Sequence, residues 1–382
     1  MQSKRRRARP PAKVPSSVAF PPFPVGLKGR RQELTTLARM VRSVQNARLA
    51  LVGGGGSGKS MLACALGYRV KASFPGGIHW FRSGPWDTRT LAEMLAIRFG
   101  SSRERRRLFP SLRDTFTRRG PTLVVLDNHE NDRAVALLLN ELDGAPVTWL
   151  VTARRCLLGG MYVFPVVAPL ATAGKSAFPR VRSLATWLRY SPLALSIADG
   201  FVRSGAVRVA ALRAWLLEHG VDRVRVIAHE DDLPEIALLV DWAWPKLTLE
   251  ERRILAVLAH IEGDHMGAAS VCLLARAGGS KDERALARLR AWNLVQRPLP
   301  TRYALHAVVR YAVARRTRFE SGRILEHYIE LLERHPERLD LEQTHLYAAM
   351  DYAQGRSDVG FILRVGRLTA SLADVVRSGG DD

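Results

Sequence analysis

The sequence GGGGSGKS occupies residues 53–60, directly after the apolar segment RLALV at residues 48–52. It has every fixed position of the pattern G-x-x-x-x-G-K-[ST], and an apolar-periodic segment, residues 60–70, follows. Glycines let successive backbone N–H groups approach a phosphate closely, because no Cβ stands in the way. A strand, this loop and a helix in that order predict a phosphate-binding loop. The alternative is a plain glycine turn before Lys-Ser.

Each part of this loop has an expected role. Lys59 would contact the β- and γ-phosphates, and Ser60 would offer its hydroxyl to Mg²⁺. The helix that starts near Lys59 would add the positive end of its dipole. The residues predicted here to bind the nucleotide are Gly53, Gly54, Gly55, Gly56, Ser57, Gly58, Lys59, Ser60 and Met61.

A second motif, TLVVLDNHE at residues 122–130, places four apolar residues in a predicted buried strand that ends at Asp127. This is a Walker B pattern, in which Asp127 would hold Mg²⁺, usually through water, opposite Ser60. Such a run is weak evidence alone, but its place after the phosphate loop strengthens it. Glu130 is predicted to orient or activate the attacking water, and an ordinary loop carboxylate is the alternative.

A third motif, TWLVTARR at residues 148–155, is a predicted strand that ends at Thr152 and is followed by Arg154. A guanidinium at this point can approach the γ-phosphate, whose oxygens match its fixed fork of donors. The chain contains 50 arginines, so only the position after the next strand favours this role.

Short apolar segments alternate with amphipathic ones up to about residue 173, which predicts βαβ units. The expected strands are residues 48–52, 77–81, 122–127, 147–152 and 162–168. The fold class is therefore α/β, a P-loop NTPase with a parallel sheet covered by helices. The predicted divisions are a basic, Pro-rich disordered leader (1–24), a nucleotide-binding domain (25–175), a helical subdomain (176–233), a winged-helix domain (234–320) and short C-terminal helices with a frayed tail (321–382).

The formal net charge is +22, from 58 basic and 36 acidic residues. Such charge is typical of proteins with a polyanionic partner, but 50 of the 58 basic residues are Arg, which GC-rich coding also produces. The three cysteines are far apart, so neither a disulfide framework nor a zinc site is expected. No stretch is long and apolar enough to span a membrane, and the basic N-terminus lacks the apolar region of a signal peptide. We therefore expect a soluble, cytoplasmic protein with no membrane partner.

Taken together, these motifs resemble the NB-ARC or STAND family of signalling ATPases over residues 25–320. LDNHE (126–130) is close to the LDNxEH form of Walker B in bacterial members linked to transcriptional regulators, and TARR (152–155) matches the family's sensor segment. GRRQEL (29–34) resembles the entry motif over the adenine and ribose, which makes Arg30 a nucleotide contact. Arg31 stands where the family usually has Glu.

The resemblance continues beyond the nucleotide-binding domain. YSPLAL (190–195) is similar to the GLPLAL motif, which implies that Pro192 packs against the adenine. DWAWPKLTLEERRILAVLAHIEG (241–263) looks like the opening of the family's winged-helix subdomain. YALHAVVRYA (303–312) resembles its closing segment, which puts His306 where the family histidine touches the β-phosphate of ADP.

The resemblance implies a molecular switch that binds ADP or ATP with Mg²⁺. ADP would hold the three parts closed, and exchange for ATP would release the winged helix and expose a surface for self-assembly. Slow ATP hydrolysis, if present, would reset it. Beyond residue 320 the chain has only about 60 residues of TPR-like helices. Either unknown effector and sensor proteins act in trans, or the chain is a truncated relic of a longer one.

Two rival functions stay open. The first is a DNA-binding regulator, in which residues 281–295 form a recognition helix and Arg284 and Arg288 face phosphates; a solvated face opposite a core stripe is its alternative. The second is a nucleotide-binding scaffold that does not hydrolyse, suggested by Asn128 and the open role of Glu130.

Overall fold

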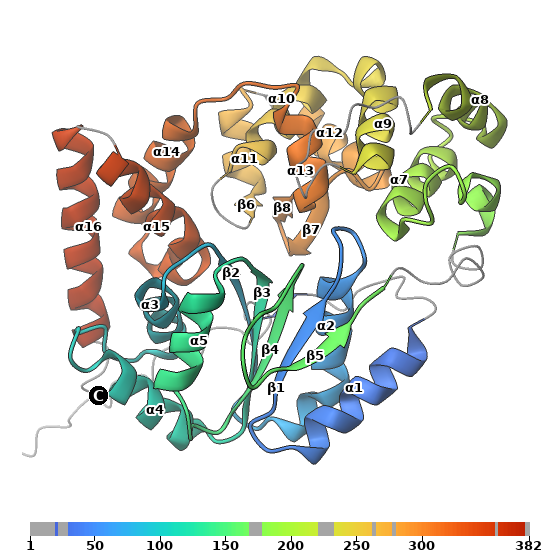
Figure 1. Ribbon diagram of the computed structural model, residues 1–382. Helices are drawn as coiled ribbons and strands as arrows, with labels where there is room; N and C mark the ends of the chain where they lie inside the picture. The colour runs from blue at the N-terminus through green and yellow to red at the C-terminus, as the bar shows by residue number, and fades with distance from the viewer. Residues whose placement is uncertain are drawn as a thin grey trace, which may run out of the picture.

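The computed structural model describes residues 20–21, 30–167, 178–220, 233–261, 265–276, 280–355 and 358–378. Its central element is a five-stranded parallel sheet with helices on both faces (Figure 1). The helices of residues 178–314 and a small antiparallel sheet lie beyond the carboxyl ends of these strands, and the C-terminal helices lie to one side. The predicted fold class, an α/β P-loop domain followed by helices and a winged helix, is confirmed.

The five predicted strands all form. They are β1 (Arg48–Val52), β2 (Ile78–Gly84), β3 (Thr122–His129), β4 (Val147–Ala153) and β5 (Tyr162–Pro165), in the order β2-β3-β4-β1-β5. Strand β2 extends three residues beyond the predicted end because its pairing with β3 continues to Gly84. Strand β5 is shorter than predicted because its last partner on β1 is Val52, after which the phosphate loop begins.

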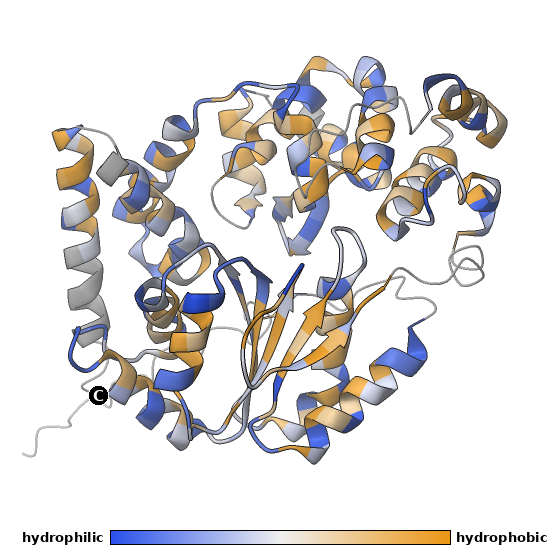
Figure 2. Ribbon diagram, viewed as in Figure 1, coloured by the Kyte–Doolittle hydropathy of each residue, from blue (hydrophilic) through white to orange (hydrophobic). Residues whose placement is uncertain are grey.

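Alternation along the strands divides the apolar side chains between the two faces of the sheet. Leu123 and Val125 point into the core under α1 and α2, whereas Val124 and Leu126 point into the core under α3, α4 and α5. The bounds of these helices are α1 (Arg31–Ser43), α2 (Lys59–Val70), α3 (Thr88–Phe99), α4 (Leu108–Arg119) and α5 (Asp132–Glu141). Figure 2 shows the hydrophobic strands between helices of mixed hydropathy, as a sheet buried on both faces requires.

The helical and winged-helix segments share one continuous hydrophobic core, in which the rings of Phe201, Trp242 and Trp292 make tilted and edge-to-face contacts. The helices of the first segment are η2 (Pro179–Leu184), α7 (Pro192–Arg203) and α8 (Val209–His219). Those of the second are α9 (Pro234–Ala243), η4 (Trp244–Lys246), α10 (Leu249–Ala259), α11 (Ala268–Leu274), α12 (Ser280–Ala291) and α13 (Ala307–Ala314). Strands β6 (Met266–Gly267), β7 (Gln296–Leu299) and β8 (Arg302–Ala304) pair in the order β6-β8-β7, and β7 and β8 form a hairpin.

The C-terminal helices are α14 (Ser321–Arg334), α15 (Leu339–Gly355) and α16 (Val359–Ser378), with η5 (Pro336–Arg338) between the first two. They have a core of their own, which also receives Trp86 and Ile97 from the nucleotide-binding part. In Figure 1, α15 lies beside α3. No helix within the described ranges is long and apolar enough to span a bilayer.

The expected leader lies mostly outside the described residues, but Phe20 and Pro21 within it are described. Phe20 is buried and makes edge-to-face contacts with Tyr68 and Trp80. The Tyr68 hydroxyl donates to the carbonyl of Pro21 over 2.8 Å. The expectation of a disordered leader is therefore wrong for these two residues. Removing the Phe20 ring from water, against the rings of Tyr68 and Trp80, lowers the free energy of the folded chain.

Candidate nucleotide site

The phosphate loop has the backbone geometry that its glycines allow. Gly56 and Gly58 have φ values of +72° and +92°, which L side chains rarely adopt, and Gly58 is the N-cap of α2. A Cβ on Gly53 would lie 2.2 Å from the carbonyl oxygen of Val166. Gly53 therefore lies directly against the backbone that follows β5, and Gly58 starts α2, whose first N–H groups have no partner within the helix.

The Lys59 ammonium lies across this loop. It donates to the carbonyl oxygens of Gly53 and Gly54 over 2.7 and 2.9 Å. Burial lowers the pKa of Lys59 to about 8, an effect that Asp127 opposes and Arg154 reinforces. A cation that is partly stripped of water and has a second cation nearby is well placed to gain from a bound phosphate.

Asp127 is held at the carboxyl end of β3 by two hydroxyls. Ser60 and Thr152 donate to its Oδ1 over 2.7 and 2.5 Å. The backbone N–H of Asn128 in turn donates to the Thr152 hydroxyl over 3.0 Å. Adjacent parallel strands bring Thr152 of β4 beside Asp127 of β3, so the end of each strand supports the other.

These donors fit Mg²⁺ held partly by a nucleotide. Mg²⁺ takes oxygen ligands and usually keeps several waters, binding through one or two carboxylates and the substrate phosphates. Ser60 and Asp127 supply one hydroxyl and one carboxylate. No group of three or more His, Cys, Asp or Glu side chains that would hold a metal by themselves occurs among the described residues.

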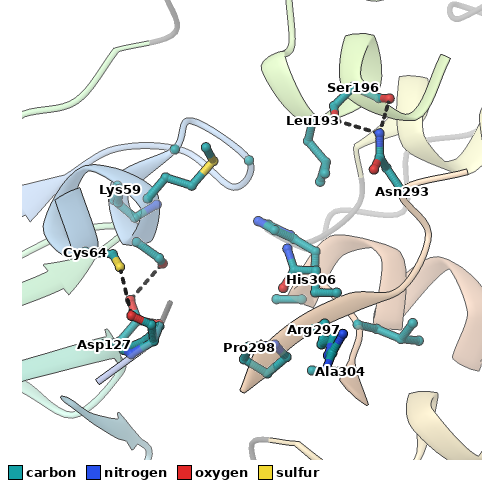
Figure 3. Close-up of a pocket in the computed structure, with 18 of the residues that line it drawn as sticks. Lys59, Cys64, Asp127, Leu193, Ser196, Asn293, Arg297, Pro298, Ala304 and His306 are labelled. Atoms are coloured by element: carbon teal, nitrogen blue, oxygen red, sulfur yellow. Dashed lines mark hydrogen bonds between the residues drawn. The ribbon is translucent and has the colours of Figure 1, made fainter. Parts of the chain in front are cut away.

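A cavity of about 1450 Å³ extends from the phosphate loop to the helical and winged-helix segments. Pro192 at the start of α7 and His306 at the start of α13 both line it, as do the loop residues from Gly55 to Met61. Figure 3 shows His306 facing Lys59 and Asp127 across the open space. The structure thus brings together residues from three separate parts of the chain, whereas Gly53 and Gly54 lie in the loop without lining the cavity.

His306 is half-buried, and its ring is neutral at pH 7. Burial and the nearby positive charges of Lys59, Arg82 and Arg154 together lower its pKa to about 4. Its Nδ1 is buried and has no hydrogen-bond partner among the described residues. A buried polar atom without a partner is costly and calls for an explanation, and a ligand in this cavity would supply one.

The chain is similar in structure to solved proteins, and one of them fits most of its length. It is a Signal Transduction ATPase with Numerous Domains (STAND) protein with a tetratricopeptide repeat sensor, from Pyrococcus horikoshii, at a TM-score of 0.58 and 15% identity. The fit covers 95% of this chain. The chain has the fold of a STAND ATPase. It spans 55% of the length of that relative.

A weaker likeness is to Cdc6p from Pyrobaculum aerophilum, with a TM-score of 0.41 and 14% identity over 80% of this chain and 99% of that one. The Aeropyrum pernix Orc1 protein in complex with DNA gives 0.36 and 16% over 77% and 94%. No protein-family model matches the chain, and a search of curated proteins finds no match.

Two predicted site residues, Arg30 and Glu130, make hydrogen bonds to other groups of the protein. Arg30 is buried, and its guanidinium donates to the carbonyl oxygens of Ser57 and Val167 over 2.6 and 2.8 Å and to Glu33 over 2.5 Å. It lines the cavity, yet these bonds make it a brace of the phosphate loop. Glu130 is exposed, does not line the cavity, and accepts from the Asn128 amide over 2.5 Å. Their predicted roles stay predictions.

Arg154 lines the cavity, and its predicted role at the γ-phosphate stays a prediction. The cavity also contains residues that the sequence did not point to. Arg82 lies at the end of β2, opposite Asp127 in the strand register. The sequence predicts Thr152 only as the end of a strand. Its contact with Asp127 follows once β3 and β4 are known to be neighbours, because the ends of adjacent parallel strands meet at one edge of the sheet. Arg297 of the hairpin lines the cavity as well (Figure 3), with no local signal in the sequence.

The arginines proposed to face DNA behave differently from each other. Arg288 donates to both carboxylate oxygens of Glu251 over 3.1 and 3.0 Å and lies over the ring of Trp292. Glu251 itself closes the capping box that starts α10, so Arg288 belongs to an internal contact between α10 and α12. Only Arg284 of the pair is fully exposed. The interpretation of α12 as a solvated face opposite a core stripe fits better, because Leu286, Leu289 and Trp292 are all buried.

Proposed function

We propose that this chain is an ADP/ATP-binding molecular switch whose closed state holds ADP. The observation that carries the proposal is the single cavity lined by the phosphate loop, by Pro192 and by His306. A ligand that contacts all three parts at once stabilises the arrangement in which they lie together. A nucleoside diphosphate matches this cavity, because the cations and the loop take the phosphates and Pro192 offers an apolar face to the base.

The residues divide the work of binding. Lys59 and the loop N–H groups hold the phosphates, while Ser60 and Asp127 hold Mg²⁺, which neutralises phosphate charge when bound. Arg154 stabilises charge at the γ-phosphate. Neutral His306 bonds to a phosphate oxygen from the winged-helix side and so reports which nucleotide is present.

Exchange of ADP for ATP would change these contacts and release the winged helix. A bistable arrangement of domains shifts only by the difference in ligand affinity between its two states. The released face would then be available for self-assembly. Effector and sensor proteins of unknown identity would act through this face.

Hydrolysis in this scheme is slow and resets the switch. A nucleotide-binding scaffold without hydrolysis is the second candidate, and one observation favours it. Glu130, the predicted base, is exposed and lies outside the cavity lining. Phosphate release therefore has to be measured separately from binding.

The test is the nucleotide that copurifies with the full chain, identified after denaturing extraction. We expect near-stoichiometric ADP in the wild type and in Lys71→Ala, an exposed lysine of η1 used as the control. We expect Lys59→Ala to carry little or none. A wild-type protein that is empty and also fails to bind added ADP or ATP with Mg²⁺ would overturn the proposal.

A further inference from the structure

A buried ion pair joins the winged-helix hairpin to the C-terminal helices. The guanidinium of Arg302 on β8 donates to both carboxylate oxygens of Glu342 on α15, over 2.7 and 2.5 Å. The two side chains are only 4% and 1% exposed. Arg338 donates to the same carboxylate over 3.0 Å. Two parallel charge-assisted bonds fix orientation as well as distance, so this pair sets where β8 lies relative to α15.

Neighbouring histidines complete the cluster around this pair. Arg302 Nε donates to His265 Nδ1 over 2.7 Å, and His345 Nε2 bonds to the carbonyl oxygen of His265 over 3.0 Å. Burial lowers the pKa of His265 to about 3 and that of His345 to about 4. Burial would raise the pKa of Glu342, but its bonds to Arg302 lower it overall. The cluster is therefore one carboxylate held by two arginines, beside neutral imidazoles.

Both partners of the pair lie next to the nucleotide cavity. Strand β8 ends at Ala304, and His306, the N-cap of α13, follows two residues later. On α15, the residues after Glu342 are Gln343 and Thr344, which are buried and line the same cavity. A shift of the ion pair would thus move His306 on one side and the α15 wall on the other.

Helix α15 is also fixed to the nucleotide-binding part. The Tyr347 hydroxyl donates to Glu93 of α3 over 3.4 Å, and its ring lies 6.3 Å from that of Trp86. Tyr347 is buried in the core under α3, α4 and α5. The chain of contacts runs from α3 through α15 and the ion pair to the hairpin, two residues before His306.

We propose that Glu342 is a positioning residue of the nucleotide site: through Arg302 it holds the β7–β8 hairpin, and with it His306, against the phosphate loop. This inference rests on the proposed function. It predicts that docking of the C-terminal helices and nucleotide retention are coupled. Because coupling is reciprocal, bound ADP also stabilises that docking, and a partner that displaces α15 would release the nucleotide.

The test compares Glu342→Gln with Glu333→Gln in the full chain. Glu333 accepts from Arg364 over 2.9 Å on the exposed side of the same helices, so it matches the loss of a charge without touching the hairpin. Two quantities are measured: dissociation of a fluorescent ADP, and amide hydrogen exchange of residues 296–306 without nucleotide. We expect Glu342→Gln to speed dissociation roughly tenfold, within the usual range of coupling between sites, and to raise exchange in the hairpin. Glu333→Gln should change neither.

A second variant separates positioning from misfolding. Removing one partner leaves a buried charge, whereas replacing both by apolar residues is often neutral for stability. We therefore expect Arg302→Met/Glu342→Leu to keep the wild-type melting temperature yet show the same faster dissociation and hairpin exchange. Wild-type dissociation and exchange in this folded double variant would overturn the inference. If the wild type binds no ADP, the proposed function fails, and hairpin exchange alone still decides whether Glu342 positions the hairpin.

Discussion

The two sides of the nucleotide cavity are built in different ways. The phosphate side, residues 53–60 with Asp127 and Thr152, is held by local bonds and by adjacent strand ends. The opposite side, Pro192, Arg297, His306 and Gln343, comes from three distant segments, and His306 Nδ1 has no bonding partner within the described protein. The phosphate side is therefore a preformed cradle, whereas the opposite side is positioned by tertiary contacts. Substitutions on the two sides should therefore change nucleotide affinity by different amounts.

The largest effect is expected from Lys59→Ala on the phosphate side. Charge-assisted hydrogen bonds contribute about 1.5–3 kcal/mol, so ADP affinity should fall about a hundredfold. Isothermal titration measures it, with Lys71→Ala as the control. Equal affinities of Lys59→Ala and the wild type would mean that the two sides do not differ as described.

The pH dependence of binding is the next effect. A phosphate favours protonated Lys59, whose pKa is about 8 in the free protein. The affinity for ADP is therefore highest below pH 8 and falls as the pH rises above 8, by about tenfold between pH 7 and pH 9. In Lys59→Arg the charge persists at pH 9, so the profile should be flat. A wild-type profile as flat as that of the arginine variant would contradict this role.

His306→Ala tests the opposite side and should have a smaller effect. Losing one hydrogen bond to a phosphate from a neutral donor should weaken ADP affinity about five- to tenfold, mostly as faster dissociation. His219→Ala is the control, because His219 is exposed at the end of α8. An effect as large as that of Lys59→Ala would show that the opposite side is as essential as the cradle.

Glu130→Gln should have the smallest effect on binding. The side chain is exposed and outside the cavity lining, so ADP affinity should stay within about twofold. Phosphate release is measured in parallel. A wild-type rate that the variant abolishes supports the catalytic role, whereas an unchanged background rate in both supports the scaffold without hydrolysis.

The same contrast explains what the sequence could predict. The phosphate side is local: a strand, a glycine loop, a helix start and a strand ending in Asp127 each have a signature within a few residues. The five strands follow from short apolar segments that alternate with longer amphipathic ones. Thr152 required only one further step, the knowledge that β3 and β4 are neighbours.

The opposite side could not be predicted in this way. His306 and Pro192 were identified through family resemblance, and no periodicity marks them. The pairing of Arg302 with Glu342 joins segments 40 residues apart, in a chain with 50 arginines. Nothing local distinguishes these two residues from solvated charges, because their burial depends on how α15 packs between α3 and the hairpin.

The most direct test of the account is the distance between the phosphate side and the winged helix in two nucleotide states. Spin labels at exposed Thr36 of α1 and Leu273 of α11 report it, in a chain with Cys64, Cys156 and Cys272 replaced. We expect a short, narrow distance distribution with ADP and a longer, broader one with Mg²⁺ and a non-hydrolysable ATP analogue. The same distribution in both states, with both nucleotides bound, would contradict it.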